Sequence, residues 1–199
     1  MLDPSWVFLS AALGLAGSTR YAIATLAGKA RPNLVTWVLW AVAPLIGFFA
    51  QLSAGVGLPA VLTLAAGLGP LIVVVSALVT RHSRSTIGSF DIACAVIAVA
   101  ALIVWIGFDA APTAVIFAVG ADAAAALPTV RKAWRDPDSE NLLFYVLVGL
   151  GATITLLTLD SWAPSDWAFA VYMLVLSLLL VAVVSTGRRH ALVRTNHRP

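Results

Sequence analysis

The stretch LPTVRKAWRDPDSENLLF, residues 127–144, contains the densest group of charges in the chain. It lies between two long apolar runs, and its charged residues are Arg131, Lys132, Arg135, Asp136, Asp138 and Glu140. We interpret the stretch as a hydrated loop between two apolar helices, and not as a catalytic cluster. Asp136 before Pro137 predicts the N-cap and first residue of the second helix, whose positive end favours the acids that follow.

The composition predicts that the solvent around this chain is a lipid bilayer. Of its 199 residues, 61% are hydrophobic and 11% are charged, whereas a soluble domain has about 25% charged residues. A single cysteine, Cys94, excludes a disulfide within the chain. None of the three histidines lies at a helical spacing from another type of metal-ligating residue. We therefore expect no metal site and no cofactor. The placement of the cations gives no reason to expect a nucleic-acid partner.

Seven apolar segments are long enough to be membrane spans, since a helix of about 20 residues crosses a bilayer. The predicted spans are residues 6–27, 35–52, 58–79, 87–108, 112–130, 142–159 and 167–186. Turn residues or charges separate them. We therefore predict an all-α integral membrane protein with seven transmembrane helices.

The lysines and arginines predict the orientation of these spans. Outside the spans they follow only the first, third, fifth and seventh, and they are Lys29, Arg31, Arg81, Arg84, Arg131, Lys132, Arg135, Arg188, Arg189, Arg194 and Arg198. Cytoplasmic loops attract such residues. The N-terminus is therefore predicted outside and the C-terminus in the cytoplasm, in a multi-pass protein of the cell membrane, with the bacterial inner membrane as the expected location. Residues 187–199 are predicted to form a basic cytoplasmic tail.

The spacing of the spans indicates an internal repeat. Residues 1–80 and 112–186 each contain three spans with a basic loop after the first. Three is an odd number of crossings, so one additional helix, in residues 81–111, keeps the two triplets parallel. We predict two parallel three-helix bundles joined by this linker helix. The sequence leaves a homo-oligomer open.

This 3+1+3 arrangement resembles the SWEET and PQ-loop membrane proteins. Pro128-Thr129 stands near the inner end of the fifth span, where that family has Pro-Gln, and the polar loop after it is similar to the family's loop. Trp37-Val-Leu-Trp40 is similar to the W-x-x-W of nicotinamide riboside transporters, which share this plan. The resemblance implies a transporter whose substrate site lies at the interface of the repeats.

Three charged residues within the predicted spans are candidates for that site. Asp122 lies near the middle of the fifth span, while Arg20 and Asp91 lie at similar depths towards the inner side. A charge in a bilayer is costly and tends to be paired or to face water. We expect Arg20 to pair with Asp91, Asp122 or both. Asp122 is predicted to line a polar cavity that binds a cationic or polar solute or carries a proton. The alternative is that the pair fixes the helix register, and the two roles are not exclusive. For Asp91, a second interpretation is that it is a water-exposed residue at the start of its span and takes no part in the site.

Aromatic, polar and proline residues complete the candidate set. Solute-binding candidates are Trp37, Trp40, Asn141 and Tyr145, and candidate motif or hinge residues are Pro128, Thr129, Pro44 and Pro70. The two tryptophans have the alternative role of interfacial anchors. A proline within a span kinks its helix, either as a static bend or as a hinge.

No catalytic motif is present, so we do not expect an enzyme. The sequence favours a carrier of a small polar metabolite that works by alternating access between the two repeats. The alternative is a membrane receptor or assembly adaptor that uses the same fold and presents residues 131–141 to a cytoplasmic protein.

Overall fold

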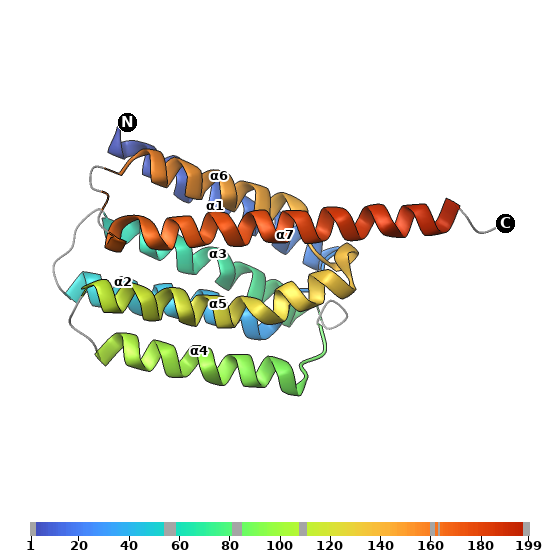
Figure 1. Ribbon diagram of the computed structural model, residues 1–199, viewed down its shortest axis with the longest axis horizontal. Coiled ribbons are helices and arrows are strands. Elements are labelled where there is room, and N and C mark those ends of the chain that lie inside the picture. The colour runs from blue at the N-terminus through green and yellow to red at the C-terminus, as the bar shows by residue number, and fades with distance from the viewer. Residues whose placement is uncertain are drawn as a thin grey trace.

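The computed structural model describes residues 3–53, 59–80, 85–107, 111–159, 162 and 164–196. Within these ranges the chain forms α-helices and short 3-10 helices and contains no strand. The elements are η1 (Pro4–Trp6), α1 (Val7–Leu26), α2 (Leu34–Ser53), α3 (Pro59–Val79), α4 (Ser89–Gly107), α5 (Ala111–Arg135), η3 (Pro137–Ser139), α6 (Leu142–Leu157) and α7 (Pro164–Asn196) (Figure 1). The prediction of an all-helical fold is confirmed, and each predicted span coincides with one helix.

Two helices are longer than predicted. Helix α5 continues through the cations to Arg135, because Asp136 precedes a proline and is therefore disfavoured in the helical conformation. Helix α7 runs to Asn196, so it continues through most of the segment predicted as a tail, whose basic and cytoplasmic character stays a prediction. Arginine, alanine and leucine are good helix formers, and no proline interrupts them before Pro199. The last turns of α7 project beyond the other helices (Figure 1).

The helices pack in two sets of three with α4 at one side. Helix α3 packs against both α1 and α2, and α7 packs against both α5 and α6. The sets meet where α1 packs against α6 and where α2 packs against α5. Helix α4 packs mainly on α5 and also touches α2. The core between the sets is aromatic, with Tyr21, Trp37, Phe144 and Tyr145 all buried.

One end of the bundle gathers the described basic loops, and we call it the basic end. Helices α1, α3 and α5 finish there, and α2, α4 and α6 begin there (Figure 1). Hydrogen bonds join these segments: Arg31 N–H donates to the Ser139 carbonyl at 2.9 Å, and Ser85 Oγ donates to the Pro32 carbonyl at 3.1 Å. The residues that follow α1 and α5 in the sequence therefore meet in space.

Two described helical stretches are long and apolar enough to cross a membrane by length and composition, namely Val7–Leu26 and Trp167–Arg189. Four further apolar stretches are shorter: Leu34–Ile46, Thr63–Val79, Ser89–Val104 and Leu142–Leu157. Association with a membrane is supported at this level, while the topology of seven crossings stays a prediction.

The contact between α2 and α3 depends on a glycine. A Cβ atom at Gly67 would lie 2.7 Å from Leu45 Cγ and 3.2 Å from the Ala41 carbonyl oxygen. We expect Gly67→Ala to lower the free energy of unfolding by about 1–3 kcal/mol, because the helices must move apart. Gly120→Ala is the matched control, since a Cβ there meets nothing within 4 Å. It should leave stability unchanged or raise it by about 1 kcal/mol. Thermal unfolding in one detergent measures both, and equal effects would contradict the prediction.

Candidate functional site

A cavity of about 640 Å³ lies in the middle of the bundle and is lined by side chains from all seven α-helices. Most of its lining is apolar, from alanine, leucine, valine, proline and aromatic side chains. Among the described lining residues Asp122 is the one carboxylate, and lysine, arginine and histidine are absent. A volume of this size is typical of sites for small organic molecules.

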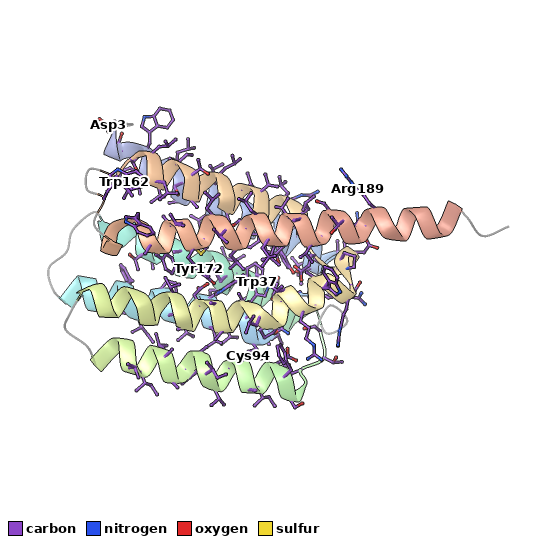
Figure 2. The ribbon with its side chains drawn as sticks, viewed as in Figure 1. Asp3, Trp37, Cys94, Trp162, Tyr172 and Arg189 are labelled. Atoms are coloured by element: carbon purple, nitrogen blue, oxygen red, sulfur yellow. The ribbon has the colours of Figure 1, made fainter. Side chains whose placement is uncertain are left out.

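Asp122 is placed in the cavity wall by α5, between Ala121 and Ala125, whose small side chains also line it. Its Oδ2 accepts a hydrogen bond of 2.6 Å from the Tyr172 hydroxyl of α7. Tyr172 lies inside the bundle between its ends (Figure 2). The Trp40 indole of α2 interacts with the same carboxylate, although its buried Nε1 forms no well-aligned hydrogen bond. The carboxylate therefore faces aromatic groups from both sets of helices.

The predicted ion pair of Arg20 with Asp122 or Asp91 is wrong. These three residues are all described, and none of them forms an ion pair with another. Arg20 is exposed, because Ser18, Tyr21, Ala22 and Thr25 form the buried face of α1 and Arg20 lies on the other side of the helix. Similar depth in a helix does not determine the direction of a side chain.

Asp91 has a structural role at the start of α4. Its Oδ2 accepts the Gly88 backbone N–H at 2.6 Å, and its Oδ1 accepts from Asn33 Nδ2 at 3.0 Å. Asn33 in turn caps α2, where its Oδ1 accepts the Val35 N–H at 3.0 Å. A carboxylate in the first turn also interacts favourably with the positive end of the helix. Asp91 is thus part of a helix-capping chain, and it does not line the cavity.

The other solute-binding candidates divide in the same way. Trp40 and Tyr145 line the cavity, whereas Trp37 and Asn141 do not. Trp37 is fully buried, with ring centroids 4.6 Å from Tyr21 and 4.9 Å from Phe144, so its alternative role as an interfacial anchor is also wrong (Figure 2). Asn141 caps α6 by accepting the Phe144 N–H at 3.3 Å. It also donates to the Arg20 carbonyl at 3.5 Å.

The prolines lie within helices, as predicted. Pro44 in α2 and Pro70 in α3 both line the cavity. Pro128 in α5 is buried outside the cavity lining, next to the fully buried Thr129. Near Pro128, Thr36 Oγ1 of α2 donates a hydrogen bond of 2.6 Å to the Ala125 carbonyl. A neighbouring helix thus supplies a donor beside the bond that the proline removes.

Glu140 is a buried acid with several partners, and it was not among the candidate site residues from the sequence. The Glu140 side chain is 0% exposed, and its Oε2 accepts hydrogen bonds from Tyr21 at 2.8 Å and Tyr145 at 2.6 Å. Its Oε1 lies 2.5 Å from Lys132 Nζ in an ion pair. Arg188 donates to its backbone carbonyl at 2.7 Å. We call these five residues the Glu140 cluster; its side chains come from α1, α5, α7, the start of α6 and the loop before it.

The loop around Glu140 differs from the prediction. Asp136 precedes the 3-10 helix η3 and makes no capping hydrogen bond, so the prediction that it caps α6 is wrong. Its carboxylate instead forms an ion pair with Arg31. The sequence predicts Glu140 within a hydrated first turn of the helix. The one signal against this was its position directly before Asn141, the N-cap of α6, which places Glu140 outside the helix. Internal contacts thus occupy much of the segment predicted to meet a cytoplasmic partner.

Metal-binding groups are not assembled in the described part of the chain, where no three side chains of histidine, cysteine, aspartate or glutamate converge. Among the described residues, the cavity wall around Asp122 and the Glu140 cluster are two places where buried polar groups from several helices meet. Comparison with protein-family models, curated proteins and solved structures finds no match to this chain.

Proposed function

We propose that this chain is a multi-pass carrier of the cell membrane, which moves a small polar solute by alternating access between two three-helix units. The observation that carries the proposal is the cavity of about 640 Å³ between the two sets of helices, with the Asp122 carboxylate in its wall. Carriers built from repeats bind their substrates near the midplane, at the interface of the repeats. The resemblance to SWEET and PQ-loop proteins is part of the proposal.

The outer faces of the helices support the membrane location. Large apolar side chains are exposed along the described helices, including Val75 of α3, Val96 and Ile103 of α4, and Val175 and Leu178 of α7. Soluble monomers rarely expose apolar surface this extensively. Lipid tails match such a surface. With the basic end in the cytoplasm, the N-terminus is outside and the C-terminus is inside.

The packing supports two parallel units, α1–α3 and α5–α7, with α4 as the linker. In each unit the third helix packs against the other two. The first helix of each unit also packs against the second helix of the other unit, as α1 does on α6 and α5 does on α2. Asn33 and Asn141 are equivalent caps, each at the start of the second helix of its unit. A pseudo-twofold axis through the cavity would relate the units, which is the symmetry found in transporters built from parallel repeats.

The Glu140 cluster supports a closed basic end. The cavity lining includes Val7 and Ser10 near the start of α1 and Phe169 near the start of α7, all towards the opposite end of the bundle. The Glu140 cluster connects Tyr21 of the first unit with the second unit near the basic end. In this proposal the cluster is the inner gate, and its contacts across the unit boundary break when the cavity opens to the cytoplasm.

Uptake into proteoliposomes tests the proposed function. A panel of labelled sugars, amino acids and amines is offered to wild type, Asp122→Asn and the control Asp91→Asn, whose carboxylate lies outside the cavity lining. We expect the wild type to move at least one solute, and Asp122→Asn to reduce its initial rate by about tenfold or more. Asp91→Asn should retain most of the rate, because the change lies outside the cavity lining and the asparagine carbonyl oxygen can still accept the Gly88 N–H.

Two outcomes would contradict the carrier. One is a wild type that moves nothing in the panel, which would favour the receptor or adaptor alternative. The other is an uptake rate that Asp122→Asn leaves unchanged. The unfolding temperature of each variant in detergent is measured first, so that a loss of uptake in a folded protein is distinguished from misfolding.

A further inference from the structure

Resting on the proposed function, we infer that the solute is a monovalent organic cation with an apolar body, such as an alkyl or arylalkyl ammonium ion. The cavity combines one fixed negative charge with aromatic and aliphatic walls, and this combination is complementary to an amphipathic amine. The inference concerns the class of solute and goes beyond the proposed carrier activity.

The first support is the charge of the cavity. Asp122 has no cationic partner among the described residues, because the ion pairs of the described chain are Arg31–Asp136, Lys132–Glu140 and Arg188–Asp138. A carboxylate within a membrane protein is stabilised by a counter-charge or by water. The Tyr172 hydroxyl is a neutral donor, so it stabilises the carboxylate without neutralising it. A bound ammonium ion supplies the missing positive charge.

The second support is the set of aromatic rings around the carboxylate. Trp40 and Phe169 line the cavity together with Asp122, and Tyr172 packs against Phe169 at 5.9 Å between ring centroids. Cations bind favourably to the faces of aromatic rings, and tryptophan is the strongest of these partners. A carboxylate next to aromatic side chains is therefore a site for an organic ammonium ion.

The third support is the scarcity of hydrogen-bonding groups for a polyhydroxylated solute. The described lining has no asparagine, glutamine, arginine or histidine. Two of its hydroxyl groups, those of Ser10 and Thr155, already form hydrogen bonds between helices. Ser10 Oγ donates a hydrogen bond of 2.9 Å to the Gly151 carbonyl and lies 3.1 Å from Thr155 Oγ1. Each buried solute hydroxyl without a partner reduces affinity. The lining thus favours an amine with a hydrocarbon body over a sugar.

Three probes of similar shape and different charge test the inference: 2-phenylethylammonium, the neutral 2-phenylethanol and the anionic 3-phenylpropanoate. Their dissociation constants are measured calorimetrically on the full chain in detergent. We expect the ammonium probe to bind about tenfold or more tightly than the alcohol, and the anion to bind most weakly. Asp122→Asn should weaken the ammonium probe about thirtyfold and leave the alcohol unchanged. Asp91→Asn should preserve the wild-type order of affinities.

The outcomes separate this inference from the proposed function. Equal binding of the ammonium and alcohol probes, as expected if Asp122 only carries a proton, would overturn the cation inference. So would an ammonium affinity unaffected in folded Asp122→Asn. If that variant does not fold, the order of the three probes on the wild type decides alone. If no probe binds but wild type moves a neutral or anionic solute, the cation inference fails and the carrier stands. If nothing binds or moves, both fail.

Discussion

Glu140→Ala is expected to lower the free energy of unfolding by about 3–5 kcal/mol, the range for breaking a buried ion pair by removing one partner. The side chain is fully buried and accepts hydrogen bonds from Tyr21 and Tyr145. Its removal leaves two buried hydroxyls without an acceptor and Lys132 without its counter-ion. Each unsatisfied buried group adds its own desolvation cost. Reversible unfolding in mixed micelles measures the change.

Two further variants show whether burial or charge causes the loss. Asp138→Ala removes an acid from the same loop whose side chain is 75% exposed, and it should cost about 1 kcal/mol or less. Glu140→Gln keeps an acceptor for the tyrosines while it removes the charge opposite Lys132, so its cost should lie between the other two. A Glu140→Ala effect as small as that of Asp138→Ala would show that the cluster does not stabilise the fold.

Trp37→Ala is expected to lower the free energy of unfolding by about 3–5 kcal/mol, because a large-to-small change at a buried aromatic leaves a cavity. Trp37 is 0% exposed and packs against Tyr21, Trp40 and Phe144. These side chains come from helices of both sets, so the loss weakens the contact between the sets. In a membrane, the main cost is the loss of van der Waals packing between the helices. This cost does not depend on exposing apolar surface to water.

Trp134→Ala is the matched control for this prediction. Trp134 is the same residue type near the end of α5, and it is 73% exposed. Its replacement should change stability by about 0.5 kcal/mol or less, as is usual for exposed positions. Unfolding of both variants in the same detergent is followed by the helical circular dichroism signal. Similar losses for Trp37→Ala and Trp134→Ala would contradict a specific role for the aromatic core.

The positions of the helices could be predicted from the sequence because apolar runs and their interruptions are local signals. Prolines, glycines and charges separate the runs, and each run forms one helix. The direction of a side chain around its helix depends on tertiary packing. Arg20 illustrates this, since its depth was predicted and its exposure was not. Asp122 was found because a charge inside an apolar helix is costly wherever it points.

The role of Glu140 could not be predicted because its partners are distant in the sequence. Tyr21 lies in the first set of helices, and only the folded chain brings its hydroxyl to the acid. A charge in a polar loop is usually hydrated, so the local sequence favours the wrong environment. The continuation of α7 to Asn196 was also missed, because the predicted end relied on hydropathy, while helix propensity continues beyond the apolar run.

The equivalence of the caps Asn33 and Asn141 has an electrical consequence for the proposed carrier. In the register that aligns the caps, Asp122 corresponds to Gly14, which also lines the cavity. One half therefore contributes a carboxylate and the other contributes no side chain. In the proposed carrier, a bound cation of the inferred class would make the loaded site neutral, whereas the returning site would be negative when Asp122 is ionised. Membrane voltage then acts on the return of the empty carrier, at about 2.3 kcal/mol per 100 mV for a charge that crosses the full potential.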